Sequence, residues 1–567
     1  MQRDVILTEV QSLTKTRVVS DQRHPVRPAG LNVAESNSPE ERTAPRVVLF
    51  RHAPAPRDSR AKKFALTLAR AGYDVIIIST EGPEASPAES RLGPVRIVHV
   101  AVTGDHLQAN NKRLIRNRAR RYPVLAVASV QGRATQVGRR KTQVALASRR
   151  ARATRERMVS ARSVAQAKSM LRWAMLRVQA ELLKRESQVM RKRNTVQARI
   201  DAAVGKGWKR YDAKRVNVAL GAGSRRDLPE ILDLADALRP VLLELRPDVM
   251  HAHHPFVLGV ATEVQRSLAA EGHHSLVVYD ARENFGGIPE LEQGSVRRHR
   301  VLMDHECRFI AACAGVSTVS EPIADVIQRR YRLPTRPTVI LNTPVLGGRT
   351  EGPTVRDVVG LPSGVPLLVY SGTISHARGI DTLVRGLAYL PDAHLVIVCV
   401  PYPHPSVPAL LAIASELGAS DRIHIVPPVD QSHLVQYLSG ADVAVHPLPG
   451  GSPNHDQALP NKLFEYTHAG LPMVVSDARL MADFVTRNNV GEVFVAGDPR
   501  SFSDAVAKVL GSPAPDAERM AALAKEFSWQ GQEQEIVDYY NGLTGHRASA
   551  PGDGEFPSLE ITGEAVI

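Results

Sequence analysis

The chain has few cysteines, few aromatic residues and no long uncharged apolar run. Of its 567 residues, three are cysteine and 5% are aromatic. Cys307, Cys313 and Cys399 show neither metal-ligand spacing nor an even count, which argues against a disulfide framework. The first residues lack the apolar core of a secretory signal, and no stretch reaches the ~18 uncharged residues of a membrane span. We therefore expect a cytoplasmic protein, with or without peripheral attachment to the inner face of the cell membrane.

Acidic residues are nearly absent from one long segment. Between Lys112 and Arg226 there are 32 Lys and Arg against five Asp and Glu, so this segment carries +27 and the rest of the chain −13. From 149 to 200, apolar residues recur at roughly helical spacing. The pattern predicts a basic α-helical insertion over 105–226. An anionic membrane surface is the partner we favour for residues 112–226. Self-association and nucleic acid are the alternatives, although nucleic-acid binding lacks a recognised motif here.

Buried strand patterns alternate with amphipathic helices over the rest of the chain. The first βαβ pattern runs from 46 to 79, and a second α/β series begins at 366. The predicted fold is therefore α/β, with two doubly wound Rossmann-like domains facing a cleft at the carboxyl ends of their strands. The expected parts are a disordered tail (1–44), an N-terminal domain (45–345), a second domain (346–526), a helix crossing back (527–545) and a disordered tail (546–567).

The segment 460–476 carries the clearest chemical signal. Its pattern predicts a short helix that starts at a Pro-Asn turn and is followed by a buried strand. A helix start offers free N–H groups and a positive dipole end to an anion, and Lys462 adds a full charge. Glu465, three residues later, can accept hydrogen bonds from the hydroxyls of a ribose. The pattern fits a nucleoside diphosphate; the alternative is that Asn461 only caps the helix and Glu465 only complements its dipole.

Seven short motifs, in this order, resemble those of the family 4 glycosyltransferases, which have the GT-B fold. The resemblance covers about residues 46–104 and 227–543. The motifs are Asp58–Arg60, Pro247–Pro255, Val278–Glu283, Val316–Glu321 with Asn342–Pro344, Tyr370–Gly372 with Arg378–Asp381, Ala441–Val443 with the 460–476 segment, and Ser528-Trp529. The resemblance implies retaining, metal-independent transfer of a sugar from a UDP- or GDP-linked donor, with no other cofactor. It implies a cell-surface polysaccharide or a glycolipid as the acceptor.

The resemblance and the positions of strand ends together give the candidate site residues. Arg378, Lys462 and Arg282 are the candidate catalytic residues, the first two for the departing phosphate. The candidate donor-binding residues are Gly372, Asn461, Glu465 and Gln457. The candidate acceptor or sugar-binding residues are His253, Asp280 and Glu283, which follow two predicted strands.

Several positions depart from the family pattern. Gln457 stands where many members have a glutamate, Thr373 stands where an arginine is common, and Arg282 replaces a histidine. A Pro-Tyr-Pro sequence at 401–403 replaces a Gly-x-Gly turn. These departures leave two other functions open: a non-catalytic protein of the same fold that uses its basic insertion to bind membrane or nucleic acid, and a nucleotide-sugar epimerase.

Overall fold

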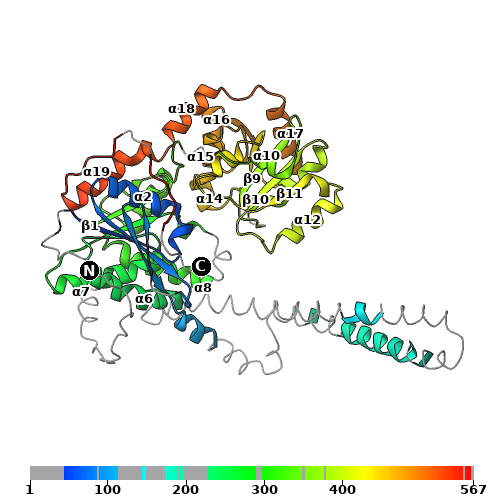
Figure 1. Ribbon diagram of the computed structural model, residues 1–567, viewed down its shortest axis with the longest axis horizontal. Coiled ribbons are helices and arrows are strands. Elements are labelled where there is room, and N and C mark those ends of the chain that lie inside the picture. The colour runs from blue at the N-terminus through cyan, green and yellow to red at the C-terminus, as the bar shows by residue number, and fades with distance from the viewer. Residues whose placement is uncertain are drawn as a thin grey trace, which may run out of the picture.

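The computed structural model shows two α/β bodies beside each other (Figure 1). Apart from a few isolated residues between 192 and 199, it describes residues 42, 44–85, 88–112, 143–148, 170–171, 173–189, 228–288, 296–347, 351–375, 378–552 and 556–562. The expected first tail lies almost entirely outside these ranges.

The first sheet has eight strands within the described residues, in the order β3-β4-β2-β1-β5-β6-β7-β8. All neighbours are parallel except β3, which runs antiparallel to β4 at the edge. Its strands are β1 (Arg46–Phe50), β2 (Asp74–Glu81), β3 (Ala88–Leu92), β4 (Val95–Ala101), β5 (Val249–Ala252), β6 (Leu276–Ala281), β7 (Gly315–Thr318) and β8 (Thr338–Val339). Because β1 is buried along its whole length, it reads as an unbroken apolar run, as the strands of a parallel sheet covered on both faces do.

Helices cover both faces of this first sheet. On one face, α6 (Pro229–Leu245), α7 (Leu258–Ala270) and α9 (Glu321–Tyr331) contribute to a large apolar core, and α8 (Val296–Ile310) packs beside α7. On the other face lies α2 (Ser59–Arg70), whose first turn is capped by Asp58 through a bond from the Ala61 N–H. The cap starts α2 directly above the end of β1, beside the cleft.

The second sheet has six parallel strands, in the order β11-β10-β9-β12-β13-β14. They are β9 (Leu367–Gly372), β10 (His394–Cys399), β11 (Ile423–Val426), β12 (Val443–His446), β13 (Met473–Ser476) and β14 (Gly491–Phe494). The helices of this body are α10 (Val355–Val359), α11 (Ile380–Gly386), α12 (Val407–Glu416), α13 (Leu434–Leu438), α14 (Pro453–Gln457), α15 (Asn461–His468), α16 (Arg479–Asn488), α17 (Pro499–Leu510) and α18 (Ala517–Glu526). Two apolar clusters fill its opposite faces, so this body is doubly wound as well.

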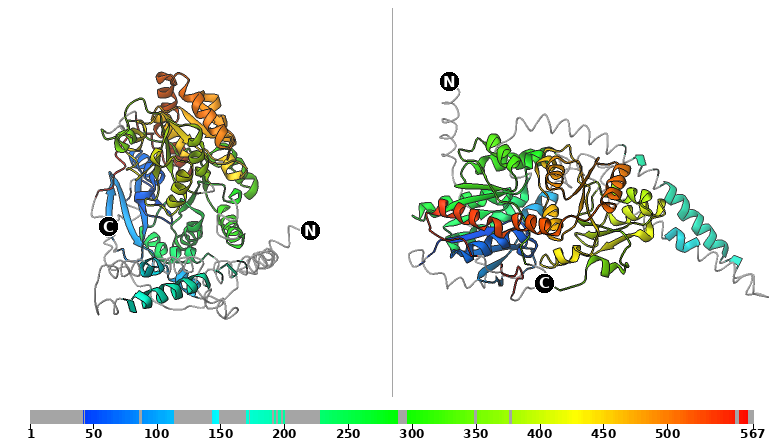
Figure 2. Two further views of the ribbon diagram at one scale, coloured as in Figure 1. Left: turned by 90° about the vertical axis from the view of Figure 1, so that its right-hand side faces the viewer. Right: turned by 90° about the horizontal axis from the view of Figure 1, so that it is seen from above.

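The C-terminal helices return from the second body to the first (Figure 2). Trp529 is fully buried, and its indole N–H donates to Thr67 of α2 at 2.9 Å. The last helix, α19 (Glu533–Thr544), packs on α2, and Tyr540 bonds His251 at 2.6 Å. This is the crossing that the sequence pattern predicts for 527–545.

The tail beyond α19 differs from the prediction. Disorder was expected for 546–567, and this is wrong for residues 556–562. Phe556 and Leu559 are buried in the core around α2, and Thr562 pairs with Arg91 on the edge strand β3. Two apolar side chains and an unpaired strand edge explain why this polar sequence is held in place.

Most of the expected insertion lies outside the described residues. Within it, 143–148 and 173–189 are helical, and the longer helix lies apart from both sheets in Figure 1, where it is drawn in teal. The apolar side chains of this helix, Met175, Val178, Leu182 and Val189, and that of nearby Leu171 are between 56% and 68% exposed. Across the residues that the structure describes, no helix has the length and hydropathy of a membrane span.

Candidate functional site

Each sheet reverses its strand order at one point, and the candidate site residues gather at these two points. In the first sheet the order reverses between β1 and β5, and in the second between β9 and β12. Doubly wound sheets bind ligands in the crevice where such strands end. His253 follows β5, and Gly372 ends β9. Residues from both domains therefore lie at the carboxyl ends of strands that flank a reversal of the strand order.

The start of α15 lacks a side-chain cap within the described residues. Its N-cap is Pro460, and no described side chain caps its first turn. Asn461 is the first helical residue and not the cap, so the first N–H groups remain available to an anion. Lys462 Nζ lies 2.8 Å from Glu465 Oε2, and the Glu465 side chain is only 3% exposed. The cation of Lys462 and the buried carboxylate of Glu465 thus lie side by side at the start of α15.

Gly372 brings its backbone close to this helix. Its φ is +146°, and a Cβ there would lie 3.0 Å from Tyr370 Oη and 3.7 Å from Lys462 Cε. Arg378 directly precedes Gly379, whose φ of +70° and closeness to the Pro447 carbonyl exclude a side chain. The charge of Arg378 acts on exposed Glu283 across the cleft. Gly372, Arg378 and Lys462 therefore surround one region.

His446 belongs to this region, and sequence reasoning missed it. It ends β12, is buried, and stacks on Tyr370 with ring centroids 5.9 Å apart. Neither ring nitrogen has a hydrogen-bond partner among the described residues. Burial, together with the charges of Arg378 and Lys462, lowers its pKa to about 3, so the ring is neutral. Only the strand order, which places β12 beside β9, identifies this histidine.

In the first domain, Asp280 is the centre of a buried ion network. Arg60 donates to both of its oxygens at 2.8 Å, and Ser317 Oγ donates at 3.0 Å. Its second oxygen also contacts Arg282 Nε at 3.0 Å and His253 Nδ1 at 3.1 Å. Burial raises the pKa of Asp280, but Arg60 and these hydrogen bonds outweigh it and hold the pKa well below its ordinary value. Asp280 therefore orients its neighbours and has no free oxygen for a substrate.

Arg282 is likewise held by carboxylates. Its two terminal nitrogens donate to the oxygens of Asp58 at 2.8 and 3.0 Å, while Nε donates to Asp280. Asp58 also accepts from Arg51 at 3.1 Å. The guanidinium spans Asp58 and Asp280 and so connects the start of α2 to the end of β6. Its candidate catalytic role stays a prediction, as does the sugar-binding role of His253.

A small pocket of about 230 Å³ opens above this network. It is lined by Arg51, His52, His253, His254, Asp280, Arg282, Glu283 and Phe285. Within the described structure, Arg51 Nε, His52 Nδ1 and His253 Nε2 are buried without a hydrogen-bond partner. Unpaired buried polar atoms are costly, so a ligand or water that bonds them would be favourable.

Gln457 connects the two domains. Its side-chain oxygen accepts from Asn284 Nδ2 at 2.8 Å, and its backbone carbonyl accepts from Ser320 Oγ at 2.6 Å. Beside it, Asn454 Oδ1 accepts from the Asn284 N–H at 3.0 Å. Gln457, which is expected to bind the donor, thus also links the second domain to Asn284 and Ser320 of the first. These contacts are between distant segments, so the sequence pattern does not predict them.

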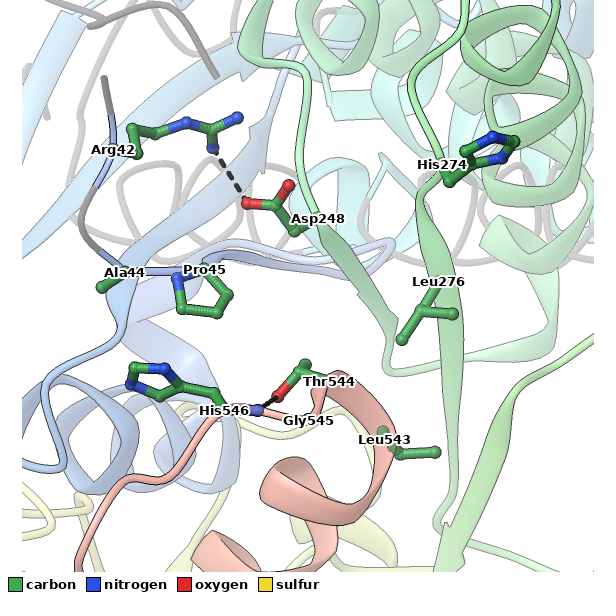
Figure 3. A pocket seen from close by; sticks show the side chains of 10 residues that line it. All are labelled: Arg42, Ala44, Pro45, Asp248, His274, Leu276, Leu543, Thr544, Gly545 and His546. Carbon is green, nitrogen blue, oxygen red and sulfur yellow. Dashed lines mark hydrogen bonds and ion pairs between the residues drawn. The ribbon is translucent and has the colours of Figure 1, made fainter. Parts of the chain in front are cut away.

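Another hollow lies at the opposite end of the first sheet (Figure 3). It has a volume of about 660 Å³ and is lined by Arg42, Asp248, His274 and His546 among others. Arg42 forms an ion pair with Asp248 at 3.2 Å. Because this hollow lies where the strands begin, far from their carboxyl ends, it is not the predicted ligand crevice.

Comparison with known proteins agrees with this architecture. The family model "Glycosyltransferase Family 4" matches residues 205–343, and "Glycosyl transferases group 1" matches residues 353–527. The chain shares its fold with sucrose-phosphate synthase from Thermosynechococcus elongatus, at a TM-score of 0.56 and 13% identity, over 88% of this chain and 99% of that one. The fold is thus the two-domain GT-B arrangement. The chain belongs to the family 4 glycosyltransferases.

Similar sequences include enzymes named D-inositol 3-phosphate glycosyltransferase. The protein from Xylanimonas cellulosilytica is 28% identical over 282 residues, which are 46% of this chain and 63% of that protein. The protein from Mycolicibacterium smegmatis is 27% identical over 316 residues, 54% of this chain and 69% of that protein. The chain therefore spans less than two thirds of the first of these relatives.

Proposed function

We propose that this protein is a retaining glycosyltransferase that moves a sugar from a nucleoside-diphosphate donor to a hydroxyl of its acceptor. The observation that carries the proposal is the arrangement around α15: an uncapped helix start, Lys462 beside the buried carboxylate of Glu465, and the charge of Arg378. Family membership supports it. Metal independence remains an expectation from the family.

The proposed chemistry follows from charge. When the bond between the sugar carbon and the phosphate oxygen breaks, negative charge grows on the diphosphate and positive charge on the sugar. Lys462, Arg378 and the N–H groups of α15 would stabilise the departing diphosphate. The acceptor oxygen forms the new bond, and its proton passes to the departing phosphate. Glu465 would hold the ribose hydroxyls.

For the acceptor, we propose that its reacting part enters the small pocket of the first domain. The polar side chains that line it, among them Arg51, His52 and Glu283, suit a ring rich in hydroxyl groups. The relatives are named for an inositol phosphate, which is such a ring. The proposed acceptor class is a polysaccharide or glycolipid at the cell surface, presented from the cytoplasmic side.

Nucleotide binding tests this proposal. UDP or GDP should raise the melting temperature of the wild-type protein, and Glu465→Ala should lose most of that increase because the ribose loses its acceptor. A matched control is Glu492→Ala, since Glu492 pairs with Lys508 on the surface of the same domain. A thermal-shift panel of nucleoside diphosphates and their sugars measures both. If no nucleotide stabilises the wild type, the donor site is refuted.

We further propose that the basic segment binds anionic membrane. The helix 173–189 supports this, because exposed apolar side chains such as Leu171, Met175 and Leu182 lie on a strongly basic segment. Apolar burial and attraction to acidic lipid then act together.

Sedimentation with liposomes tests the membrane contact. The triple variant Leu171→Gln/Met175→Gln/Leu182→Gln should lower binding to vesicles rich in phosphatidylglycerol by about tenfold or more, because three apolar side chains that would enter the bilayer are lost. The exposed polar position Gln188 provides a control as Gln188→Ala. Equal binding by the triple variant and wild type would contradict the proposal, and preferential binding of RNA over vesicles would favour nucleic acid.

A further inference from the structure

A third cavity lies between the domains, and Glu465 is one of the residues that line it. Its volume is about 600 Å³. From the second domain it is lined by Gln431, Ser432, Leu434, Val435, Glu465, His468, Ala521 and Ala524; from the first domain and the connection by Ser59, Lys63 and residues 344–347; and from the C-terminal tail by residues 556–559. The carboxylate proposed for the ribose thus opens into a largely apolar chamber.

The described part of the tail is attached to the first domain. The carbonyl of Leu559 accepts from Lys62 Nζ at 2.9 Å. Arg91 and Thr562 exchange two backbone hydrogen bonds of 2.8 Å. The guanidinium of Arg70 lies 5.3 Å from the centre of the Phe556 ring. These three attachments, all to α2 or β3, hold residues 556–559 against the cavity as a wall.

The chemistry of the walls indicates what the cavity takes. On the second domain, Leu434, Val435 and Ala524 form an apolar surface, and Phe556 and Leu559 line the cavity from the other domain. A flat heterocycle attached to a ribose at Glu465 would enter this space, because no other part of a nucleotide sugar is both flat and apolar on its faces. Gln431 and Ser432 place polar groups at the edge, where a base carries its hydrogen-bonding atoms.

We infer that residues 556–559 of the tail form one wall of the nucleoside pocket, so that Phe556 and Leu559 help to set the affinity and base preference for the donor. This inference rests on the proposed function, because it takes the nucleoside to extend from Glu465. It adds a binding element at the very end of the chain. The nucleoside then contacts both domains at once, and donor binding draws them together.

The first experiment compares a nucleoside diphosphate with inorganic pyrophosphate. Calorimetry should show that Phe556→Ala binds UDP or GDP about tenfold more weakly than wild type, because the wall beside the base loses its largest side chain, which is also anchored in the core around α2. Affinity for pyrophosphate, which reaches only Lys462 and Arg378, should stay unchanged. Glu560→Gln is the matched control, because Glu560 is exposed on the same tail and does not line the cavity.

A second variant weakens the attachment of the tail and leaves the side chains of residues 556–559 unchanged. Thr562→Pro removes the N–H that Thr562 donates to Arg91, and it lies outside the cavity. It should also weaken nucleoside diphosphate binding selectively, by releasing the tail. If wild type binds nucleoside diphosphate and both variants bind it equally well, or if pyrophosphate affinity falls in parallel, the inference is wrong. If wild type binds no nucleotide, the proposed function itself fails.

Discussion

Replacing Lys462 by alanine is expected to lower kcat/KM for the nucleotide sugar by about 10²–10³-fold, the range seen when one preorganised charge-stabilising donor is removed. Lys462 Nζ lies 2.8 Å from Glu465 Oε2 at the start of α15, so the variant loses a cation and also leaves the buried carboxylate unpaired. That carboxylate would then repel the diphosphate. Steady-state kinetics with the donor identified by the nucleotide panel measures the effect.

The size of this effect distinguishes a site residue from a surface charge. Lys508→Ala removes the same charge from the same domain, but Lys508 pairs with Glu492 and is 65% exposed. It should leave kcat/KM within about twofold, since exposed ion pairs contribute little. Lys462→Arg restores the charge with a different shape and should recover part of the activity. Full activity in Lys462→Ala would place the departing phosphate elsewhere.

Much of the fold was predictable because its determinants are local. The strands at 46–50 and 366–372 are apolar runs bounded by turn residues, and both are central strands in the structure. A parallel strand buried on both faces leaves this pattern whatever its partners are. The edge strand β3 was missed because its sequence, AESRL, alternates weakly and is half exposed.

The candidate site was predictable where one segment carries the chemistry. Lys462 and Glu465 are three residues apart on one helix, so their meeting follows from helical spacing. His446 and Lys63 were missed because their neighbours come from distant segments. Lys63 bonds Asn342 at 3.0 Å and is buried; burial lowers its pKa to about 7. No local pattern marks a lysine for such a position.

In the first domain, the structure shows that Asp280 and Arg282 are paired with each other and with residues from distant segments. Asp280 lies near the end of β6, and its main partner is Arg60, 220 positions away. Sequence reasoning identified Asp280 and could not identify that partner. The position of the first-domain pocket therefore depends on an ion network that only the tertiary structure reveals.

Breaking this network should produce the largest loss of stability. Asp280→Asn keeps the shape of the side chain but removes its charge. Arg60, whose side chain is 1% exposed, would then lose its carboxylate partner and keep neutral ones: the amide oxygen at position 280, the carbonyl of Ile340 and the ring of Phe64. An uncompensated buried charge costs about 3–5 kcal/mol, so the free energy of unfolding of the first domain should fall by that amount. Urea unfolding followed by the fluorescence of buried Trp529 measures it.

The difference in the free energy of unfolding between wild type and Asp280→Asn should depend on pH if it arises from the charge of Asp280 and not from packing. Since Arg60 and the hydrogen bonds hold the pKa of folded Asp280 well below its ordinary value, despite the opposing effect of burial, the carboxylate stabilises the fold above the unfolded pKa of about 3.9. That stabilisation fades as the pH falls below this value. The difference in the free energy of unfolding between wild type and Asp280→Asn should therefore have its full size at pH 7 and decrease below pH 4. Asp74→Asn, at a carboxylate that is 40% exposed, should cost only about 1 kcal/mol or less. If this difference in the free energy of unfolding stayed constant with pH, Asp280 would stabilise the fold through packing and not through its charge.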